Sequence, residues 1–321
     1  MADFDAFNGD ADGICSLIQL RLAEPRDSQL ITGVKRDIEL VERVDASTGD
    51  RVTVLDISFD KNRDAVQRVL DAGAEVLYID HHFAGDVPEN PRLTTVINTS
   101  ADVCTALLVN GRLKGRYAAW AVVGAYGDNL QDSARAAAAP LALGPGQLQA
   151  LEQLGIYINY NGYGAALADL HFSPEALYRC LLNYANPLDF IDEAGEDYRR
   201  LEQGYKDDMA AAAALQPERV SDEVAVFIMP DAPWARRVSG VYSNDLANQF
   251  PGRAHGVLTE KPNGNYLVSV RAPLRNKTGA DVLCRQFATG GGRAAAAGIN
   301  DLPKEMAGAF IAALEKQFGG A

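Results

Sequence analysis

The stretch Val76-Leu77-Tyr78-Ile79-Asp80-His81-His82 is a short apolar run that ends in one carboxylate and two imidazoles. Residues 75–79 are apolar enough for a strand that is buried on both faces, as in a parallel sheet. In open α/β sheets the ligand crevice lies beyond the carboxyl ends of the strands, where Asp80, His81 and His82 would lie. Two adjacent histidines alone are weak evidence, so the interpretation of this stretch as a site depends on the other strands.

The bulk composition predicts a soluble chain with two domains. It has 321 residues, 47% of them hydrophobic, which is enough for two cores. There is no apolar run of about 18 residues, and the acidic N-terminus lacks the regions of a signal peptide, so we expect a cytoplasmic protein with no membrane partner. The four cysteines are scattered without a CxxC pair, which predicts reduced, packed thiols.

The charge is unevenly distributed along the chain. The net charge of −13 argues against tight binding of long duplex nucleic acid, which depends on Lys and Arg. Residues 220–321 carry 11 Lys and Arg against 9 Asp and Glu, a net of +2, which leaves −15 for residues 1–219. The first part suits cation binding and the second could hold an anion, although ordinary surface variation explains the difference equally well on its own.

Near the N-terminus, a predicted strand (residues 3–7) leads into a turn with two carboxylates. The turn is Asn8-Gly9-Asp10-Ala11-Asp12-Gly13, and a helical apolar pattern follows over residues 14–22. In an extended segment alternate residues point the same way, so Asp10 and Asp12 would face adjacent metal positions. The alternative is that Asp12 caps the helix, and the two roles can coexist.

Two further predicted elements end in an aspartate. The strand at residues 52–55 runs into Asp56, and a helix of small residues at 117–126 ends at Gly127-Asp128-Asn129. Singly, Asp56 is as readily a cap or loop anchor, and Gly-Asp is a common helix stop. Three strands that end in candidate ligands are harder to dismiss, and oxygen ligands with a nitrogen donor suit Mn²⁺ or Mg²⁺.

The remaining segments of the first half are assigned structural roles. Residues 130–170 are interpreted as loop and helix pieces, with a turn at residues 159–164 whose tyrosines pack under their own loop. Thr105 is interpreted as a cap or turn residue. Residues 196–215 predict a long helix that connects the two domains.

The C-terminal part predicts a second α/β core with a glycine-rich loop. Strands are expected at residues 224–229, 256–259 and 266–271, and helices at 239–250, 280–287 and 303–318. The three glycines at residues 290–292 would let the backbone approach a ligand and present N–H groups to an anion. Arg293 would stand at the start of an alanine-rich helix. No Walker loop is indicated, because no GK[ST] follows.

Taken in order, these motifs resemble the DHH phosphoesterase superfamily, which is named for the triplet found here at residues 80–82. The resemblance covers nearly the whole chain and includes the DxDG turn, the aspartates at 56 and 128, and a DHH-associated domain with a GGG loop. It implies an α/β protein with an N-terminal parallel-sheet DHH domain (1–195), a helical linker (196–219) and a smaller substrate-binding α/β domain (220–321).

The resemblance also implies a two-metal phosphoesterase. Two Mn²⁺ ions about 3.5–4 Å apart would lower the pKa of a bridging water and stabilise the charge that develops on phosphorus. Asp56 would bridge both ions and Asp10 would serve one of them, with Mg²⁺ as the alternative metal. The ligands of the other ion would be Asp12, His81 and Asp128.

The same resemblance implies the substrate contacts. His82 would contact the substrate or its leaving group beside Asp56, while Asp80 would orient other side chains without binding metal. The expected substrates are short single-stranded oligonucleotides and linear or cyclic dinucleotides, with a phosphatase on small bisphosphorylated nucleotides as the alternative. A homodimer is compatible with the sequence. In the second domain, phosphate would be bound by Arg271, Gly290, Gly291, Gly292 and Arg293.

Ala6 and Arg293 depart from the family's pattern. Many relatives carry a histidine four residues before the first Asp of the DxD, where this chain has Ala6, so one metal site would lose a nitrogen ligand and bind more weakly. The glycine loop usually continues with histidine, and Arg293 keeps a charge for phosphate but cannot shuttle a proton at neutral pH. Both departures leave open a member that binds nucleotides without hydrolysing them.

Overall fold

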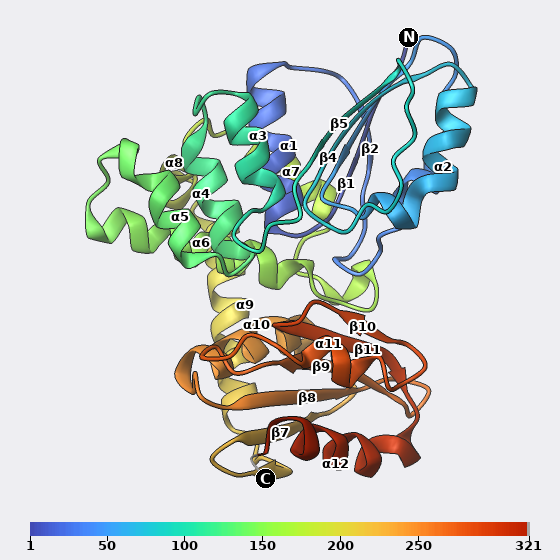
Figure 1. Cartoon of the computed structure of the whole chain (residues 1–321). Coiled ribbons are helices and arrows are strands. Elements are labelled where there is room, and N and C mark those ends of the chain that lie inside the picture. Colours follow the sequence, from blue (N-terminus) through green and yellow to red (C-terminus); the bar gives the residue numbers. More distant parts are fainter. Residues whose placement is uncertain (320–321) are drawn as a thin grey trace. The chain divides into compact units, whose positions relative to one another are not determined.

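The computed structural model describes residues 1–319, and the chain divides into two compact units, Met1–Glu202 and Gln203–Ala321. Each unit contains one β-sheet with helices packed on it (Figure 1). The division falls inside α9 (Glu196–Ala213), the long helix that the sequence predicted. The two sheets confirm the α/β class, with a parallel sheet in the N-terminal part and a second α/β core after the helix.

A five-stranded, fully parallel sheet organises the first unit. Its order is β2-β1-β3-β4-β5, and its strands are β1 (Asp3–Phe7), β2 (Gln29–Ile31), β3 (Arg51–Leu55), β4 (Glu75–Asp80) and β5 (Leu93–Ile97). Phe7, Leu55 and Ile79 lie in register at the carboxyl edge of the sheet. The residues that follow β3 and end β4, Asp56 and Asp80, therefore share this edge.

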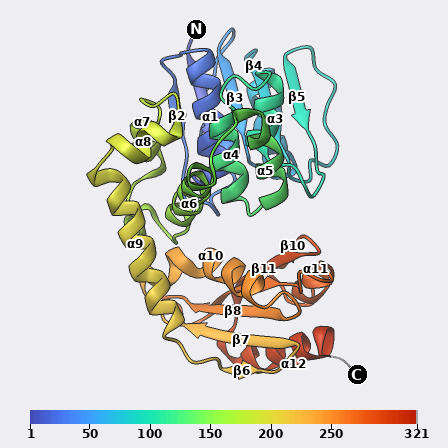
Figure 2. The same cartoon turned by 90° about the vertical axis from the view of Figure 1, so that its left-hand side faces the viewer.

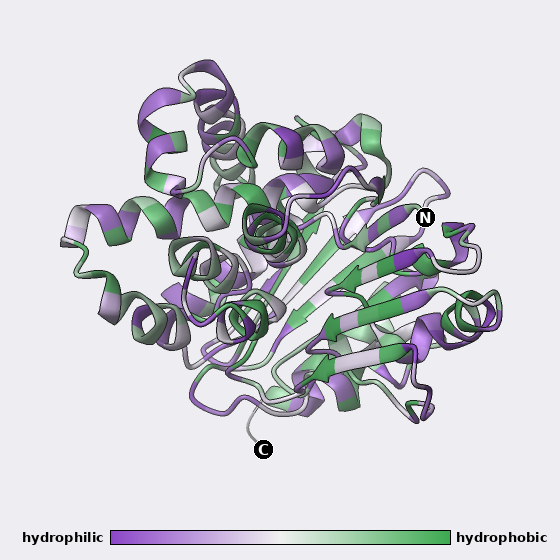
Figure 3. Cartoon of the chain, turned by 90° about the horizontal axis from the view of Figure 1, so that it is seen from above, coloured by the Kyte–Doolittle hydropathy of each residue, from purple (hydrophilic) through white to green (hydrophobic). Residues whose placement is uncertain are grey.

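Helices cover both faces of the first sheet. The face formed by alternate residues such as Phe4, Val54 and Tyr78 packs on α2 (Phe59–Asp71), and α1 (Ala11–Ala23) lies on the opposite face (Figure 1). Apolar residues run along the strands, as burial on both faces requires (Figure 3). The remaining helices of the unit are η1 (Leu40–Arg43), α3 (Thr105–Arg112), α4 (Ala118–Gly127), α5 (Gln131–Ala138), η2 (Ala139–Leu141), α6 (Pro145–Gly162), η3 (Leu167–Asp169), α7 (Pro174–Leu181) and α8 (Pro187–Glu193).

Two local predictions for the first unit are wrong. The DxD is not extended, because α1 already begins at Ala11 and Asp12 lies in its first turn; the N-cap is Asp10, whose carboxylate accepts from the N–H of Gly13 at 3.0 Å. Residues 159–162 are not a turn but the last residues of α6. Burial of this segment against its neighbours outweighs the low helix propensity of Asn and Gly.

A six-stranded mixed sheet organises the second unit. Its order is β10-β11-β9-β8-β7-β6, with β7 and β8 parallel and the other pairs antiparallel. The strands are β6 (Arg219–Val220), β7 (Val224–Met229), β8 (Ala254–Glu260), β9 (Tyr266–Arg271), β10 (Gly290–Gly292) and β11 (Ala296–Leu302). The helices are α10 (Pro233–Gln249), α11 (Ala280–Cys284), η4 (Lys304–Met306) and α12 (Ala307–Phe318).

Helices on both faces also cover the second sheet (Figure 2). Val224 and Val226 belong to a cluster with Phe310 of α12, whereas the ring of Phe227 lies 5.6 Å from that of Tyr242 of α10. Alternate residues of a strand point to opposite faces, so α10 and α12 cover different faces.

The alanine-rich helix expected after Arg293 does not exist. Residues 290–292 and 296–302 instead form the antiparallel pair β10–β11, and β11 also pairs with β9. Alanine favours helices by less than about 1 kcal/mol per residue, which strand pairing on both sides of β11 readily outweighs. The helix predicted at residues 280–287 is shorter in the structure, where α11 ends at Cys284.

None of the helices described in residues 1–319 combines the length and the apolar character that crossing a membrane requires. The four cysteines are free thiols in the structure; three of them are buried, and Cys180 is partly exposed.

Candidate metal centre

Asp56 lies at the centre of the carboxyl edge in an unusual backbone conformation. It follows β3 with φ of 59°, in the left-handed region that non-glycine residues rarely adopt. Its N–H donates to the carbonyl of Ile79 at 3.1 Å, so β4 holds this conformation in place. Such outliers concentrate at functional sites, because the surroundings must stabilise them.

The carboxylate of Asp12 is held by the N-terminus of α3. Both oxygens accept backbone N–H groups at 2.7 Å, one from Thr105 and one from Ala106. The hydroxyl of Thr105 also donates to Asp56 at 3.2 Å. The assignment of Thr105 to a cap or turn missed these contacts, because sequence proximity gives no signal for a carboxylate 93 residues away.

His81 presents one nitrogen to three carboxylates. Its Nδ1–H donates to the carbonyl of Val103 at 2.8 Å, which leaves Nε2 with its lone pair. Nε2 lies 3.5 Å from oxygens of Asp56 and Asp128 and 3.9 Å from one of Asp12. We refer to Asp12, Asp56, His81 and Asp128 as the carboxylate–histidine cluster.

Close helix packing brings Asp128 to this cluster. Asp128 follows α4, and Gly127 allows that helix to approach α1, since a Cβ at Gly127 would lie 2.3 Å from the Cβ of Ala11. At Gly124 a Cβ would meet that of Ala106 at 2.6 Å. The two glycines therefore allow the close packing that positions Asp128. The sequence had indicated only that Gly127-Asp128 ends a helix.

The electrostatics of the cluster fit a divalent cation. Burial and then the charge of Asp128 raise the pKa of Asp12, and burial with the charges of Asp12 and Asp10 raises the pKa of Asp56 well above its ordinary value. A cation would offset both effects. Ligand atoms of Asp12, His81 and Asp128 lie within 4.8 Å of one another, as do those of Asp56, His81 and His82.

The neighbouring thiols do not change the choice of metal. Burial raises the pKa of Cys15 and Cys104 well above its ordinary value, so both remain protonated at neutral pH. The available donors are then carboxylate oxygens and imidazole nitrogen, which suit Mn²⁺ or Mg²⁺.

Asp80 is buried, and its contact is with His82. Its Oδ1 lies 2.7 Å from Nδ1 of His82, and that nitrogen lies 3.9 Å from Asp56. The side chain of His82 is 39% exposed, so it reaches both the cluster and solvent. The prediction that Asp80 orients another side chain without joining the ligands stays a prediction, and its partner in the structure is His82.

Asp10 lies beside the cluster and is bound by a lysine. One of its carboxylate oxygens accepts from Gly13 and the other from the ammonium group of Lys35. Burial alone lowers the pKa of Lys35, but the charge of Asp10, with those of Tyr163 and Asp128, raises it well above its ordinary value. No sequence pattern pointed to Lys35, which lies in an irregular segment between β2 and η1.

The predicted phosphate contacts of the second unit lie at one end of its sheet. Arg271 ends β9, where its Nε donates to Asn244 at 2.7 Å and its Nη1 to Ser269 at 3.0 Å. Ala296 pairs with Arg271, and the exposed Arg293 lies in the turn just before β11. Both arginines thus belong to neighbouring strand ends.

Glycine is required in the loop at residues 290–292, because its backbone lies very close to neighbouring backbone atoms. A Cβ at Gly290 would lie 1.7 Å from the carbonyl oxygen of Cys284, and Gly292 has φ of 135°. Gly291 pairs with Gly298 in the β10–β11 ladder, and β10 is an edge strand. The loop thus lies on an edge strand and not at a helix N-terminus, and its contact with a ligand stays a prediction.

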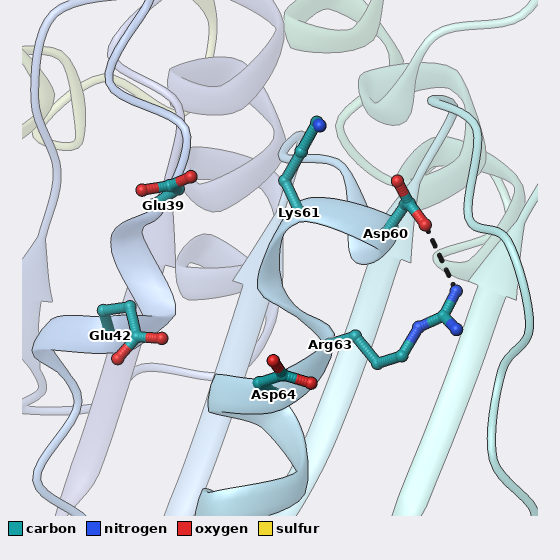
Figure 4. A pocket seen from close by; sticks show the side chains of 6 residues that line it. All are labelled: Glu39, Glu42, Asp60, Lys61, Arg63 and Asp64. Atoms are coloured by element: carbon teal, nitrogen blue, oxygen red, sulfur yellow. Dashed lines mark hydrogen bonds and ion pairs between the residues drawn. The ribbon is translucent and has the colours of Figure 1, made fainter.

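A polar depression on the surface of the first unit is separate from this centre (Figure 4). It lies over η1 and α2, and Figure 4 shows the ion pair of Asp60 and Arg63, at 3.2 Å. None of the predicted site residues lines it. Its lining residues are Glu39, Glu42, Asp60, Lys61, Arg63 and Asp64.

Comparison with known proteins shows similarity in structure and not in sequence. No protein-family model and no curated protein matches the sequence. A crystal structure of exonuclease RecJ bound to manganese superposes with a TM-score of 0.63 and 18% identity, over 98% of this chain and 89% of that one. RecJ from Thermus thermophilus in complex with Mn²⁺ gives 0.65 and 19%, over 98% of this chain and 51% of its own.

A third similar structure is the pGpG-specific phosphodiesterase PggH from Vibrio cholerae, with a TM-score of 0.56 and 15% identity over 99% of this chain and 98% of that one. The chain spans about half the length of the Thermus thermophilus RecJ chain. At these identities the comparison shows the fold alone: the chain shares the fold of RecJ and of PggH.

Proposed function

We propose that the chain is a metal-dependent phosphoesterase that hydrolyses short oligonucleotides or dinucleotides. The observation that carries the proposal is the convergence of four donors, from the starts or ends of four separate elements, at the carboxyl edge of one parallel sheet. The fold shared with manganese-bound RecJ and with PggH supports the same class of reaction.

Different residues of the first unit are assigned to metal binding and to substrate contact. A bound Mn²⁺ or Mg²⁺ supplies the Lewis acid that activates water and offsets charge on phosphorus. The carboxylate–histidine cluster would hold it. The N–H groups at the N-terminus of α3 orient the carboxylate of Asp12 and favour its charged form against the effect of burial. His82, held at Nδ1 by Asp80, is assigned to the leaving oxygen as substrate contact and proton donor.

In the second unit we assign phosphate binding to Arg271, Arg293 and the backbone of residues 290–292. Asn244 and Ser269 fix the position of the Arg271 guanidinium, whose permanent positive charge suits a phosphate. The excess of basic residues from Val220 onward supports an anionic ligand for this unit.

Asp56→Asn tests the proposal with the least disturbance of the backbone. Asn tolerates the left-handed conformation at this position better than Ala does, so the variant removes one charge and keeps the fold. We expect release of nucleoside monophosphate from di- to pentanucleotides with Mn²⁺ to fall by more than about 100-fold, because even groups behind metal ligands cost about 10–100-fold. Asp60→Asn, in the surface depression, is the matched control and should keep full activity.

A second candidate function is nucleotide binding without hydrolysis, favoured by Ala6 and by the Lys35–Asp10 ion pair. A substrate panel with Mn²⁺ separates the candidates: short RNA and DNA, linear and cyclic dinucleotides, and 3′-phosphoadenosine phosphates as monoesters. Hydrolysis of the monoesters alone would indicate a phosphatase. Nucleotide binding with no hydrolysis of any member would overturn the phosphoesterase assignment.

A further inference from the structure

The ammonium group of Lys35 lies where a second cation would find its ligands. It contacts a carboxylate oxygen of Asp10, the side-chain oxygen of Asn159 at 2.9 Å and an oxygen of Asp128 at 3.7 Å. These are the hard oxygen donors that a divalent ion also prefers. Lys35 thus contacts Asp128, which belongs to the carboxylate–histidine cluster, and forms an ion pair with Asp10, which does not belong to it.

The position of Lys35 is built by its backbone and not only by its flexible side chain. Its N–H donates to the carbonyl of Gly162 at 2.8 Å, and its own carbonyl accepts from the side chain of Asn8 at 3.2 Å. The segment is pressed against the DxD turn, since a Cβ at Gly9 would lie 2.0 Å from the carbonyl oxygen of Gly33. The side chain of Lys35 is only 23% exposed.

The aromatic ring beside Lys35 also favours the lysine ammonium group at this position. The ring centroid of Tyr163 lies 5.3 Å from the ammonium nitrogen, within the range of a cation–π contact. Tyr163 follows the last residue of α6, whose carbonyl anchors Lys35. One helix end therefore supplies both the backbone anchor and the ring.

Ala6 of β1 supplies no metal donor. It is fully buried in the apolar cluster of the α2 face, with Val54 and Leu40. The chain therefore lacks a nitrogen ligand on the Asp10 side and has a fixed positive charge there.

We propose that Lys35 replaces the second metal ion, so that the protein works with one divalent cation in the carboxylate–histidine cluster and one lysine ammonium beside Asp10. The inference rests on the proposed metal-dependent function. A divalent ion at Asp10 would lie within a few ångströms of the ammonium, and like charges so close repel strongly at a partly buried site. The lysine thereby limits the site to a single ion.

Metal stoichiometry tests this directly, without an activity assay. Protein equilibrated with saturating Mn²⁺ and freed of excess ion is analysed for manganese per chain, and the bound ions are examined by electron paramagnetic resonance. We expect one uncoupled ion in the unmodified protein. Lys35→Met should bind a second ion and show the spin-coupled signal of a manganese pair, because Asp10 and Asp128 then lose their cation.

Lys61→Met is the matched control, since Lys61 lines the surface depression and its loss should leave one ion per chain. Lys35→Gln serves as a second variant that keeps a polar side chain, and thermal melts verify that each variant folds. Two ions in the unmodified protein, or no gain in either Lys35 variant, would overturn the role of Lys35 and leave the proposed function standing. No bound ion in any of the proteins would overturn both.

Discussion

The sheets of the two units bury different kinds of side chain. The parallel sheet of the first unit buries Asp5, Asp56 and Asp80, together with Arg21 and His81 from elements around it. Among the described residues after Gln203, the buried acidic and basic side chains are Asp208 and His255. The first unit therefore combines an apolar core with buried charge, whereas the second depends mainly on apolar packing.

This difference follows from how the strands are arranged. In the first unit the carboxyl ends of five parallel strands meet at one edge, so residues just beyond the strands converge. In the second, strands run in both directions, so that carboxyl ends of strands lie at both edges of the sheet. The first arrangement brings like charges together, and burying them in the charged form is unfavourable without a compensating cation.

The largest expected effect comes from breaking the buried ion pair of the first unit. Arg21 binds Asp5 through Nε at 2.7 Å and Nη2 at 2.5 Å, and the two side chains are 3% and 1% exposed. Arg21→Met leaves a buried carboxylate without its partner, so the free energy of unfolding should fall by about 3–5 kcal/mol in urea titrations. Arg179→Met, which breaks the exposed pair with Glu175, should cost less than about 1 kcal/mol. Equal losses would contradict the contrast between buried and exposed charge.

The second unit buries one histidine, His255, and its stability should therefore decrease at acidic pH. Burial, and then the charge of Arg253, lowers the pKa of His255 to about 4, and neither ring nitrogen has a hydrogen-bond partner among residues 1–319. In the unfolded chain the pKa is about 6.5, so the unfolded state binds the proton first. Stability should therefore be complete above about pH 6.5 and decrease as the pH falls towards 4, by up to about 3 kcal/mol.

Tryptophan fluorescence can assign this loss to the second unit, because Trp120 lies in the first unit and Trp234 in the second. Denaturant titrations at several pH values in a Trp120→Phe background should show the decrease for Trp234. In His255→Leu the decrease between pH 6.5 and 4 should be much smaller. An unchanged slope in that variant would assign the acid sensitivity to other groups.

The smallest expected effect concerns the glycine loop, where two neighbouring glycines form a matched pair. Gly290→Ala forces a methyl group against the carbonyl of Cys284 and should lower the stability of the second unit by about 1–3 kcal/mol. Gly291→Ala meets nothing within 4 Å and should be close to neutral. Thermal melts followed by Trp234 measure both, and similar values would show that the loop relaxes freely.

Several strands, and the position of Asp56 and Asp80 at one edge of the first sheet, were predictable from the sequence, because both follow from local pattern. Apolar runs located β1, β4, β7 and β9 to within one residue, and parallel strand ends must meet at one edge. The misses depend on contacts between distant segments. Residues 159–162 are helical because they are buried against the site, and residues 296–302 form a strand because β9 and β10 pair with them.

The site itself was predicted less completely. The aspartates and His81 could be recognised from their places at the ends of predicted elements. Thr105 and Lys35 could not, because their contacts with Asp12 and Asp10 depend on how distant segments pack together. Lys35 stands in no motif, and only the anchoring by Gly162 and Asn8 brings it to Asp10. Sequence pattern located the members of the carboxylate–histidine cluster, but it did not locate Lys35 or the contacts of Thr105.

The four members of the carboxylate–histidine cluster lie far apart along the chain, with successive members separated by 44, 25 and 47 positions. An ion held by all four would act as a reversible cross-link that closes three long loops, and the unfolded chain offers no comparable site. At about 100 times its dissociation constant it would add about 2.7 kcal/mol to the stability of the first unit alone. Chelation would then loosen one half of the molecule and leave the other unchanged.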